Sequence, residues 1–283
     1  MRSDFAVFIM VHGRPDRDWT YKSLRSHGYT GKIFLVADNL DETVGEYKEK
    51  YGDELLVFDK HEAAKKYDSG DNTGDLRSTM FAANTVFDLA ENAGVKYFCL
   101  MCDDYYRFRY RHPCSDNESL LTTYITDLNR VFGCYLDFLI GTNFTIIALA
   151  QTGDFIGGLN SAILKEPLRR KAMNSFICSV ERRFEFMGRL NEDATTYVHL
   201  GGKGHLIATF PGATLDQMPT QAHSAGLTEV YKDTGTYLKS FFSVMYNPSC
   251  VEVYMMGQSH KRMHHHIKWN NAVPLIISEK HKK

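Results

Sequence analysis

No apolar segment of this 283-residue sequence is long enough to cross a lipid bilayer, and the first residues, Met1 to Asp4, lack a signal-peptide pattern. The formal net charge is only −1, which argues against a protein that coats nucleic acid by charge alone but is compatible with a local basic patch. With 43% hydrophobic and 24% charged residues, the composition is that of a soluble globular protein with a large core.

Cysteines are few and dispersed, and common nucleotide-binding motifs are absent. Of the six cysteines, Cys99 and Cys102 have the C-x-x-C spacing, but Cys99 lies inside an apolar run and no second pair follows. A structural zinc site needs four ligands, so we favour buried, reduced thiols in a cytosolic protein. Neither G-x-G-x-x-G nor a Walker sequence follows the first apolar run, which argues against a dinucleotide-binding Rossmann protein and a P-loop enzyme.

A short apolar run at 97–102 ends abruptly in two carboxylates, Asp103 and Asp104. Its length and the preceding Gly94 predict a buried strand, and in an open α/β sheet ligands bind at the carboxyl ends of the strands. Two adjacent carboxylates at that edge suit Mg²⁺ or Mn²⁺ bound to a diphosphate. A strand-ending turn, in which Asp is common, explains the pair equally well at this point.

Strand and helix patterns alternate through the first hundred residues. The predicted strands are 5–11, 32–37, 55–58 and 97–102, and the predicted helices are 15–27, 42–51 and 77–89. This alternation predicts a mostly parallel central sheet flanked by helices in a single large α/β domain. Residues 61–75 break this alternation, and the polar, turn-rich segment 69–75 is expected to be a loop over the ligand edge or a disordered lid. Further along, we expect a helix at 120–131 and strands at 137–141, 146–151 and 251–255.

Several residues near predicted strand ends have nucleotide-binding chemistry. Gly13 permits a tight turn after the first strand, and Arg14 can pair with phosphate. Asp38 follows the second strand, where an acid often contacts the sugar or base of a nucleotide, with a turn or an N-cap as an equal alternative. The adjacent Gly157 and Gly158 allow a backbone to approach a ligand closely.

Aromatic and basic residues alternate directly after the acid pair. In a strand, Arg107, Arg109 and Arg111 share one face, which suits a polyanion such as substrate phosphates or a DNA backbone. An edge strand protected from aggregation by basic residues is the alternative.

A second acid pair, Glu192 and Asp193, precedes a predicted helix. A carboxylate there can act as general base on an acceptor hydroxyl, although acids at a helix N-terminus are also favoured by the helix dipole. Near the end of the chain His264, His265 and His266 are consecutive, and one or two of them could bind one metal ion.

Taken together, these features resemble a GT-A-type glycosyltransferase and, more narrowly, the TET/JBP-associated glycosyltransferases of bacteriophages, which modify hydroxymethylated pyrimidines in DNA. Each matching stretch is short, and their order and spacing carry the likeness along essentially the whole chain. One position departs from the family pattern, in which three acids precede a Tyr: Cys102 occupies the first of them, which bears on which Asp binds metal and on metal dependence. The matching stretches are 13–15, 28–29, 58–60, 103–105, 191–193, 235–240 and 262–265.

The resemblance implies a role for each candidate residue. Asp38 would face the uracil or ribose of a UDP-sugar, and Gly157 and Gly158 would line the sugar site. Asp104 would hold a divalent metal, Mn²⁺ or Mg²⁺, with His264 or His265 completing its ligands. Asp193, or Glu192, would face the acceptor hydroxyl. The nucleotide-sugar-binding set is completed by Gly13, Arg14, Arg77 and Asp103.

The resemblance also implies a single GT-A-like domain over 1–283, with a nucleotide-sugar-binding half at 1–104 and an acceptor-binding half at 105–283. The expected reaction moves a sugar from a UDP-sugar to the hydroxymethyl group of a 5-hydroxymethylpyrimidine in phage DNA, in the cytoplasm of the infected bacterium, without a membrane partner. We take 5-hydroxymethylcytosine as the first candidate. A catalytically inactive GT-A-like module that binds nucleic acid or protein, and a nucleotidyltransferase, are the alternatives. No pattern identifies the sugar, the stereochemical course or the oligomeric state.

Overall fold

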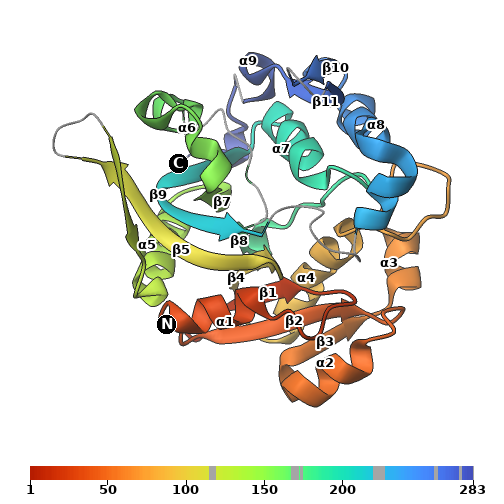
Figure 1. Ribbon diagram of the computed structural model, residues 1–283, viewed down its shortest axis with the longest axis vertical. Coiled ribbons are helices and arrows are strands. Elements are labelled where there is room, and N and C mark those ends of the chain that lie inside the picture. The colour runs from red at the N-terminus through yellow and green to blue at the C-terminus, as the bar shows by residue number, and fades with distance from the viewer. Residues whose placement is uncertain are drawn as a thin grey trace.

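The first hundred residues form the strand–helix alternation expected from the sequence (Figure 1). The computed structural model describes residues 1–114, 119–166, 172, 175–218, 227–257, 261–273 and 276–282. Strands β1 and β4 are buried on both faces, which explains their continuous apolar runs. The elements of this part are β1 Phe5–Met10, α1 Trp19–Ser26, β2 Lys32–Asp38, α2 Val44–Tyr51, β3 Leu55–Phe58, α3 Lys60–Lys66, α4 Met80–Asn92 and β4 Tyr97–Cys102.

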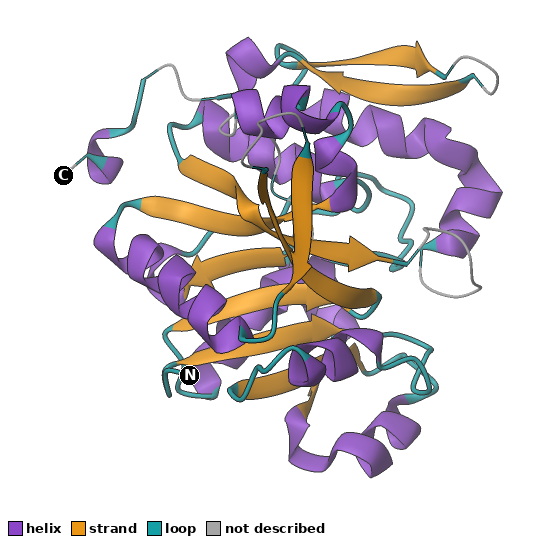
Figure 2. Cartoon of the chain, turned by 60° about the vertical axis from the view of Figure 1, so that its left-hand side comes forward, coloured by secondary structure: helices purple, strands orange, loops and turns teal. Residues whose placement is uncertain are grey.

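The second part of the chain extends the same sheet and adds a small separate one. Figure 2 shows the main strands running through the middle of the molecule and the two-stranded β10–β11 sheet apart from them at the top. The elements are β5 Tyr105–Pro113, β6 Leu120–Tyr124, α5 Leu128–Gly141, β7 Phe144–Gln151, α6 Ala162–Lys165, β8 Ser175–Ser179, α7 Glu192–Gly202, β9 Leu206–Gln217, α8 Thr228–Tyr246, β10 Val251–Met256, β11 Arg262–Ile267 and α9 Trp269–Ala272.

The main sheet of the described chain has nine strands in the order β3-β2-β1-β4-β8-β7-β9-β5-β6. The strands β3, β2, β1 and β4 are mutually parallel, as are β7 and β9, while β8 and β5 pair antiparallel with their neighbours and β6 pairs antiparallel with β5. The predicted α/β fold with a central sheet flanked by helices is therefore confirmed, but the sheet is mixed, and its parallel pairs are concentrated in the N-terminal half. The carboxyl ends of β1, β2, β3 and β4 meet at one edge, which positions the candidate site.

Two apolar clusters lie on opposite faces of the sheet. Phe8 and Leu100 point to a face covered by α4 and α7, whereas Val7 and Met101 point to the face covered by α1 and α5. No helix in the described part of the chain is long and apolar enough to span a membrane. Because β4 pairs with β8, both predicted halves share one sheet; the division at residue 104 stays a prediction.

Two predicted elements are wrong, and one helix was not predicted. The predicted loop at 69–75 contains no helix or strand, whereas the unpredicted helix α3 at Lys60–Lys66 is capped by Asp59, whose carboxylate accepts from the Glu62 amide at 3.0 Å. The predicted helix at 120–131 begins instead as strand β6, and α5 begins only at Leu128. The predicted strand at 137–141 is the end of α5, since five apolar-rich residues do not distinguish helix from strand.

Candidate active site

The turn after β4 holds the acid pair and is fixed by helix α1. The Thr20 hydroxyl donates to the Cys102 carbonyl at 2.7 Å and accepts from the Tyr105 amide at 2.9 Å. The Thr20 amide donates to the Asp103 carbonyl at 3.3 Å. These three bonds place both carboxylates at the carboxyl edge of the parallel strands.

Each carboxylate of the pair has one bound oxygen and one oxygen without a partner. Arg14 Nη2 donates to Asp103 Oδ1 at 2.7 Å, and Gln217 Nε2 donates to Asp104 Oδ2 at 2.9 Å. Within the described residues, the buried Asp103 Oδ2 and Asp104 Oδ1 accept no hydrogen bond. Burial raises the pKa of Asp103 to about 6 and also raises the pKa of Asp104. Unpartnered buried acceptors of hard oxygen type fit a divalent cation.

The loop after β1 packs against this pair. Gly13 has φ 67°, a left-handed conformation that favours glycine, and its amide donates to Asp41 Oδ2 at 2.9 Å. The Arg14 amide donates to the Tyr47 hydroxyl at 3.1 Å while its guanidinium pairs with Asp103. The structure thus brings Arg14 to the acid pair, with Gly13 in the turn before it, at the carboxylate edge where a cation would bind.

Asp38 is buried and already held by protein groups. Lys60 Nζ lies 3.0 Å and His12 Nδ1 lies 3.2 Å from Asp38 Oδ2, and the Leu40 amide donates to Oδ1 at 3.1 Å. Burial opposes ionisation, but the hydrogen bonds with His12 and Lys60 outweigh it and lower the pKa of Asp38 to about 2. The same contact with Asp38 raises the pKa of His12. Direct contact between Asp38 and a nucleotide stays a prediction; the more exposed His12 ring lies in front of it.

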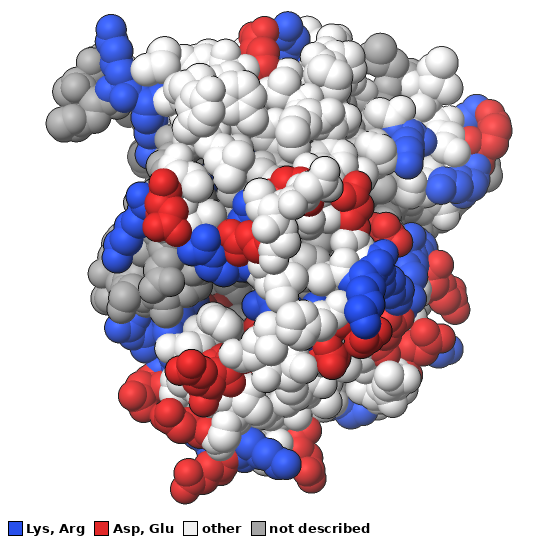
Figure 3. All heavy atoms as spheres, turned by 90° about the vertical axis from the view of Figure 1, so that its right-hand side faces the viewer, with Lys and Arg blue, Asp and Glu red and all other residues white. Residues whose placement is uncertain are grey.

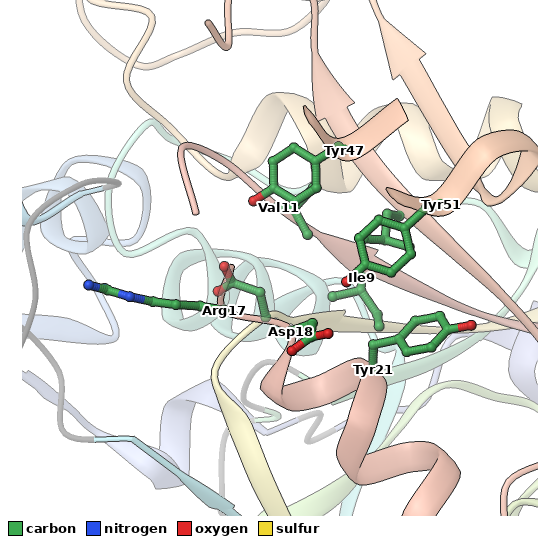
Figure 4. Close-up of a pocket in the computed structure, with 9 residues that line it drawn as sticks. Ile9, Val11, Arg17, Asp18, Tyr21, Tyr47 and Tyr51 are labelled. Carbon is green, nitrogen blue, oxygen red and sulfur yellow. The ribbon is translucent and has the colours of Figure 1, made fainter. Parts of the chain in front are cut away.

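A small cavity lies behind Asp103, between α1, α2 and the sheet. Tyr47 and Tyr51 enter it from α2 and Tyr21 from α1, with Ile9 and Asp18 beside them (Figure 4). It has room for about one water molecule, so it is too small for a nucleotide. Burial raises the pKa of Tyr47 and Tyr51, so both hydroxyls are neutral at physiological pH.

The second acid pair, Glu192 and Asp193, opens α7. The Thr79 hydroxyl donates to Glu192 Oε1 at 2.6 Å, and Asp193 Oδ1 accepts from the Ala194 amide at 2.7 Å. Burial, together with the Asp193 charge, raises the pKa of Glu192. Burial raises the pKa of the Cys102 thiol, and the charges of Asp104, Asp103 and Glu192 raise it further. Glu192 therefore lies within electrostatic reach of the strand end that carries the first pair, although it is far from Asp104 in the sequence.

Asn191 connects the second acid pair to strand β11. It adopts φ 60°, its Nδ2 donates to the Ser243 hydroxyl, and the same atom lies 3.2 Å from Nδ1 of the buried His265. The His264 and His265 rings are 4.3 Å apart. In the described ranges no three His, Cys, Asp or Glu side chains are grouped as a metal site. The structure therefore places His265 beside the second acid pair without joining it to Asp104, and a metal-binding role for either histidine stays a prediction.

Two arginines hold the segment 68–79 against the site. Arg77, predicted to bind the nucleotide, instead pairs with Asp75 and Asp233, both at 2.9 Å, and its nucleotide role stays a prediction. Arg189 is only 2% exposed and pairs with Asp71 and Asp75, again at 2.9 Å each. Nothing in the sequence around Arg189 signalled this role, because its partners lie more than a hundred residues away.

A further polar cluster lies beside the acid pair on strands β5 and β9. Asp216 accepts from Arg109 and from the Thr152 hydroxyl, and its second buried oxygen has no partner in the described chain. The Arg111 guanidinium lies over the Phe155 ring, 4.8 Å from its centroid. Strand β9 was not predicted, because Pro211 and Gly212 interrupt its pattern at the register shift.

Gly157 and Gly158 serve the turn that follows Phe155. Their φ angles are 98° and 60°, which side chains rarely adopt. A Cβ on Gly157 would make ordinary contacts, and one on Gly158 would meet nothing within 4 Å. The backbone conformation thus explains why glycine occupies both positions, and a role of Gly157 and Gly158 at a sugar site stays a prediction.

Comparison with protein families matches residues 5–226 to the family described as TET-Associated Glycosyltransferase. No curated protein was found to match the chain.

Among solved structures, the chain is similar to glucosyl-3-phosphoglycerate synthase from Mycobacterium tuberculosis in complex with Mg²⁺ and uridine diphosphate. The TM-score is 0.48 at 10% identity, covering 93% of this chain and 87% of that one. The mannosyltransferase PcManGT from Pyrobaculum calidifontis in complex with GDP-Man and Mn²⁺ has a TM-score of 0.47 at 13% identity, covering 78% and 59%. TarS from S. aureus has a TM-score of 0.46 at 11% identity, covering 76% and 37%.

Proposed function

The chain belongs to the TET-associated glycosyltransferase family, and from this premise we propose that it transfers a sugar from a UDP-sugar to the hydroxymethyl group of 5-hydroxymethylcytosine in phage DNA. Mn²⁺ or Mg²⁺ is the cofactor in this proposal. Phage DNA as acceptor would place the reaction in the cytoplasm of the infected bacterium. The family match supports the reaction class, and the side chains around Asp103 and Asp104 support the chemistry.

The observation that carries the proposal is the pair of buried, unpartnered carboxylate oxygens on Asp103 and Asp104. These two residues would hold the divalent cation, which when bound neutralises charge on the leaving diphosphate. Arg14, which already contacts Asp103, is positioned to add a second positive charge at the phosphates. His12 and Lys60, oriented by Asp38, supply further hydrogen-bond donors at the same edge.

Of the two candidate bases, Glu192 suits the role better than Asp193. Burial raises the pKa of Glu192, so its carboxylate is a stronger base, and Thr79 fixes the position of one oxygen. Asp193 bonds to the first turn of its own helix. In this proposal Glu192 accepts the proton of the acceptor hydroxyl as that oxygen bonds to the sugar. Asn191, the residue before Glu192, contacts His265.

Cys102 is the feature that keeps an inactive binding module as an alternative. Its thiol is neutral because burial raises its pKa, so it does not supply the third acid of the family pattern. In our assignment Asp103 and Asp104 suffice, since both retain an available oxygen.

The test measures UDP release from several UDP-sugars on DNA with and without hydroxymethylated bases, with Mn²⁺ or with chelator. We expect release that needs both the cation and the hydroxymethyl base. Asp104→Asn should lower the rate at least a hundredfold, about 3 kcal/mol of transition-state stabilisation. Asp53→Asn, on the exposed surface after α2, is the matched control and should retain the wild-type rate.

DNA binding without UDP-sugar binding by the folded protein would instead support the inactive module. Consumption of a nucleoside triphosphate with release of pyrophosphate would support a nucleotidyltransferase.

A further inference from the structure

Three side chains at the base of the β5–β6 hairpin form an exposed aromatic and basic patch. The Arg107 guanidinium carbon lies 5.2 Å from the Tyr106 ring centroid and 5.5 Å from that of Tyr124. Tyr106 is 38% exposed and Tyr124 is 62% exposed. We call Tyr106, Arg107 and Tyr124 the hairpin patch. It begins two residues after Asp104.

The backbone explains how these side chains come together. The register between β5 and β9 shifts between Tyr105 and Arg107, so Tyr105 is buried in the core while the next two residues turn outward. On the other side, Tyr124 is paired directly with Arg109, the neighbour of Arg107 on the same face of β5. A bulge at this position re-aims side chains next to the site, and here it joins residues from two strands.

Arg107 and its neighbour Arg109 differ in whether an acidic side chain balances their positive charge. Arg109 is matched by the buried Asp216, whereas no carboxylate in the described part of the chain forms an ion pair with Arg107. On the face with α3 and α8, by contrast, acidic and basic side chains lie side by side over its middle and lower parts (Figure 3). A polyanion would therefore find at the hairpin patch a positive charge that no described acidic partner offsets.

We propose that the hairpin patch is the contact surface for acceptor DNA, with the tyrosine rings stacking on bases beside the modified pyrimidine and Arg107 pairing with the backbone. This inference rests on the proposed function, because it assigns the acceptor of that same site. A base that reacts must leave the duplex stack, and exposed rings beside the acids can stabilise the neighbours that it leaves behind. Arginine suits the position because its planar guanidinium stacks on rings and still donates to phosphate.

The test measures binding of fluorescently labelled DNA by anisotropy, without nucleotide sugar, using single strands and duplexes that contain 5-hydroxymethylcytosine. Tyr124→Ala should weaken binding about tenfold, in the range measured for base–aromatic stacking, while Tyr124→Phe retains the ring and should bind like wild type. Arg107→Ala should weaken binding and reduce the salt dependence of affinity by about one phosphate contact.

Matched controls come from the same region. Leu121→Ala removes an exposed side chain from the opposite face of β6, and Arg130→Ala removes an exposed charge from α5; both should bind DNA like wild type. Unchanged binding by Tyr124→Ala and Arg107→Ala, or no DNA binding by the wild type, would overturn the proposal. The proposal would also be overturned if these variants changed only the oligomeric state measured by sedimentation. The patch would then be a contact between copies of the chain, for which the edge strand β6 is suited.

The two proposals fail separately. Wild-type binding through the patch without any sugar transfer would contradict the proposed function and leave the DNA surface intact. Sugar transfer by the wild type, with normal DNA binding by the patch variants, would contradict the DNA surface alone.

Discussion

Asp38 and Asp103 are both buried aspartates at the same edge of the sheet, yet their surroundings shift the pKa in opposite directions. Asp38 has two basic neighbours on one oxygen, so its pKa falls to about 2. Asp103 has a single arginine and one unpartnered oxygen, so burial prevails and its pKa rises to about 6. The first is a completed structural interaction, and the second is a carboxylate that a cation would complete.

Replacing Asp38 tests the structural interaction. Asp38→Asn should lower the free energy of unfolding at pH 7 by about 2 kcal/mol, because the folded pKa lies about two units below the usual value. A depressed pKa stabilises the fold above the unfolded pKa near 4, and that contribution is lost as the pH falls toward 2. Urea unfolding of both proteins should therefore show a gap that narrows below pH 4; a gap independent of pH would contradict this assignment.

Cation binding tests the proposed metal-binding role of the unpartnered carboxylate oxygens of Asp103 and Asp104. Mn²⁺ should raise the melting temperature more at pH 7.5 than at pH 5, because protons compete with the cation below the Asp103 pKa of about 6. Thermal unfolding with and without Mn²⁺ measures the effect. Asp104→Asn should lose most of the shift and Asp53→Asn should keep it. An equal shift at both pH values, or in both variants, would place the cation elsewhere.

At the scale of elements, the local sequence pattern predicted those helices and strands that local contacts determine. The strands β1 to β4 and helices α1, α2 and α4 followed from apolar runs and turn residues, and so did the acid pair at the end of β4. The end of helix α5 was misassigned and strand β8 was missed, because short apolar segments fit either period and tertiary pairing decides between them. Strand β9 was missed because Pro211 and Gly212 interrupt its pattern. In the candidate site, Glu192 could be predicted from the sequence because it stands at the start of a predicted helix. The roles of Lys60 and Arg189 could not, because their partners lie far from them in the sequence.

The segment 68–79 shows such a long-range dependence. Its part at 69–75 was expected to be a loop or a lid, and it contains no helix or strand. Arg189 binds two of its aspartates, the Arg189 amide donates to the Ser69 carbonyl at 2.7 Å, and Ser78 donates to the Arg189 carbonyl at 2.7 Å. These bonds fix Thr79, which in turn holds Glu192. Arg189 is therefore a positioning residue for the candidate base.

Arg189→Met should lower the free energy of unfolding by about 2–4 kcal/mol, because it leaves two aspartates without their buried partner. It should also lower kcat more than it raises KM for the nucleotide sugar. Arg77→Met is the matched control: it shares Asp75 but is largely exposed, so its loss should cost less than about 1 kcal/mol. Urea unfolding and initial rates measure both, and equal effects in the two variants would contradict a special role for Arg189.

At the scale of the whole molecule, one continuous sheet joins a parallel half to a mixed half, and the candidate groups come from both. Asp103, Asp104 and Arg14 come from the parallel half, whereas Glu192, His265 and the hairpin patch come from the remainder of the chain. Pairing of β4 with β8 and of β5 with β9 joins these two parts of the chain in one sheet. That arrangement suits a transferase, whose donor and acceptor must meet at one place.

The most direct test is the intact mass of a DNA duplex that contains a single 5-hydroxymethylcytosine, measured after incubation with the protein, Mn²⁺ and UDP-sugars in turn. We predict that one donor adds the mass of one sugar residue to the modified strand, and that unmodified DNA and reactions with chelator gain nothing. No mass gain with any UDP-sugar, from folded protein that binds Mn²⁺, would contradict the assignment of this site to sugar transfer from UDP.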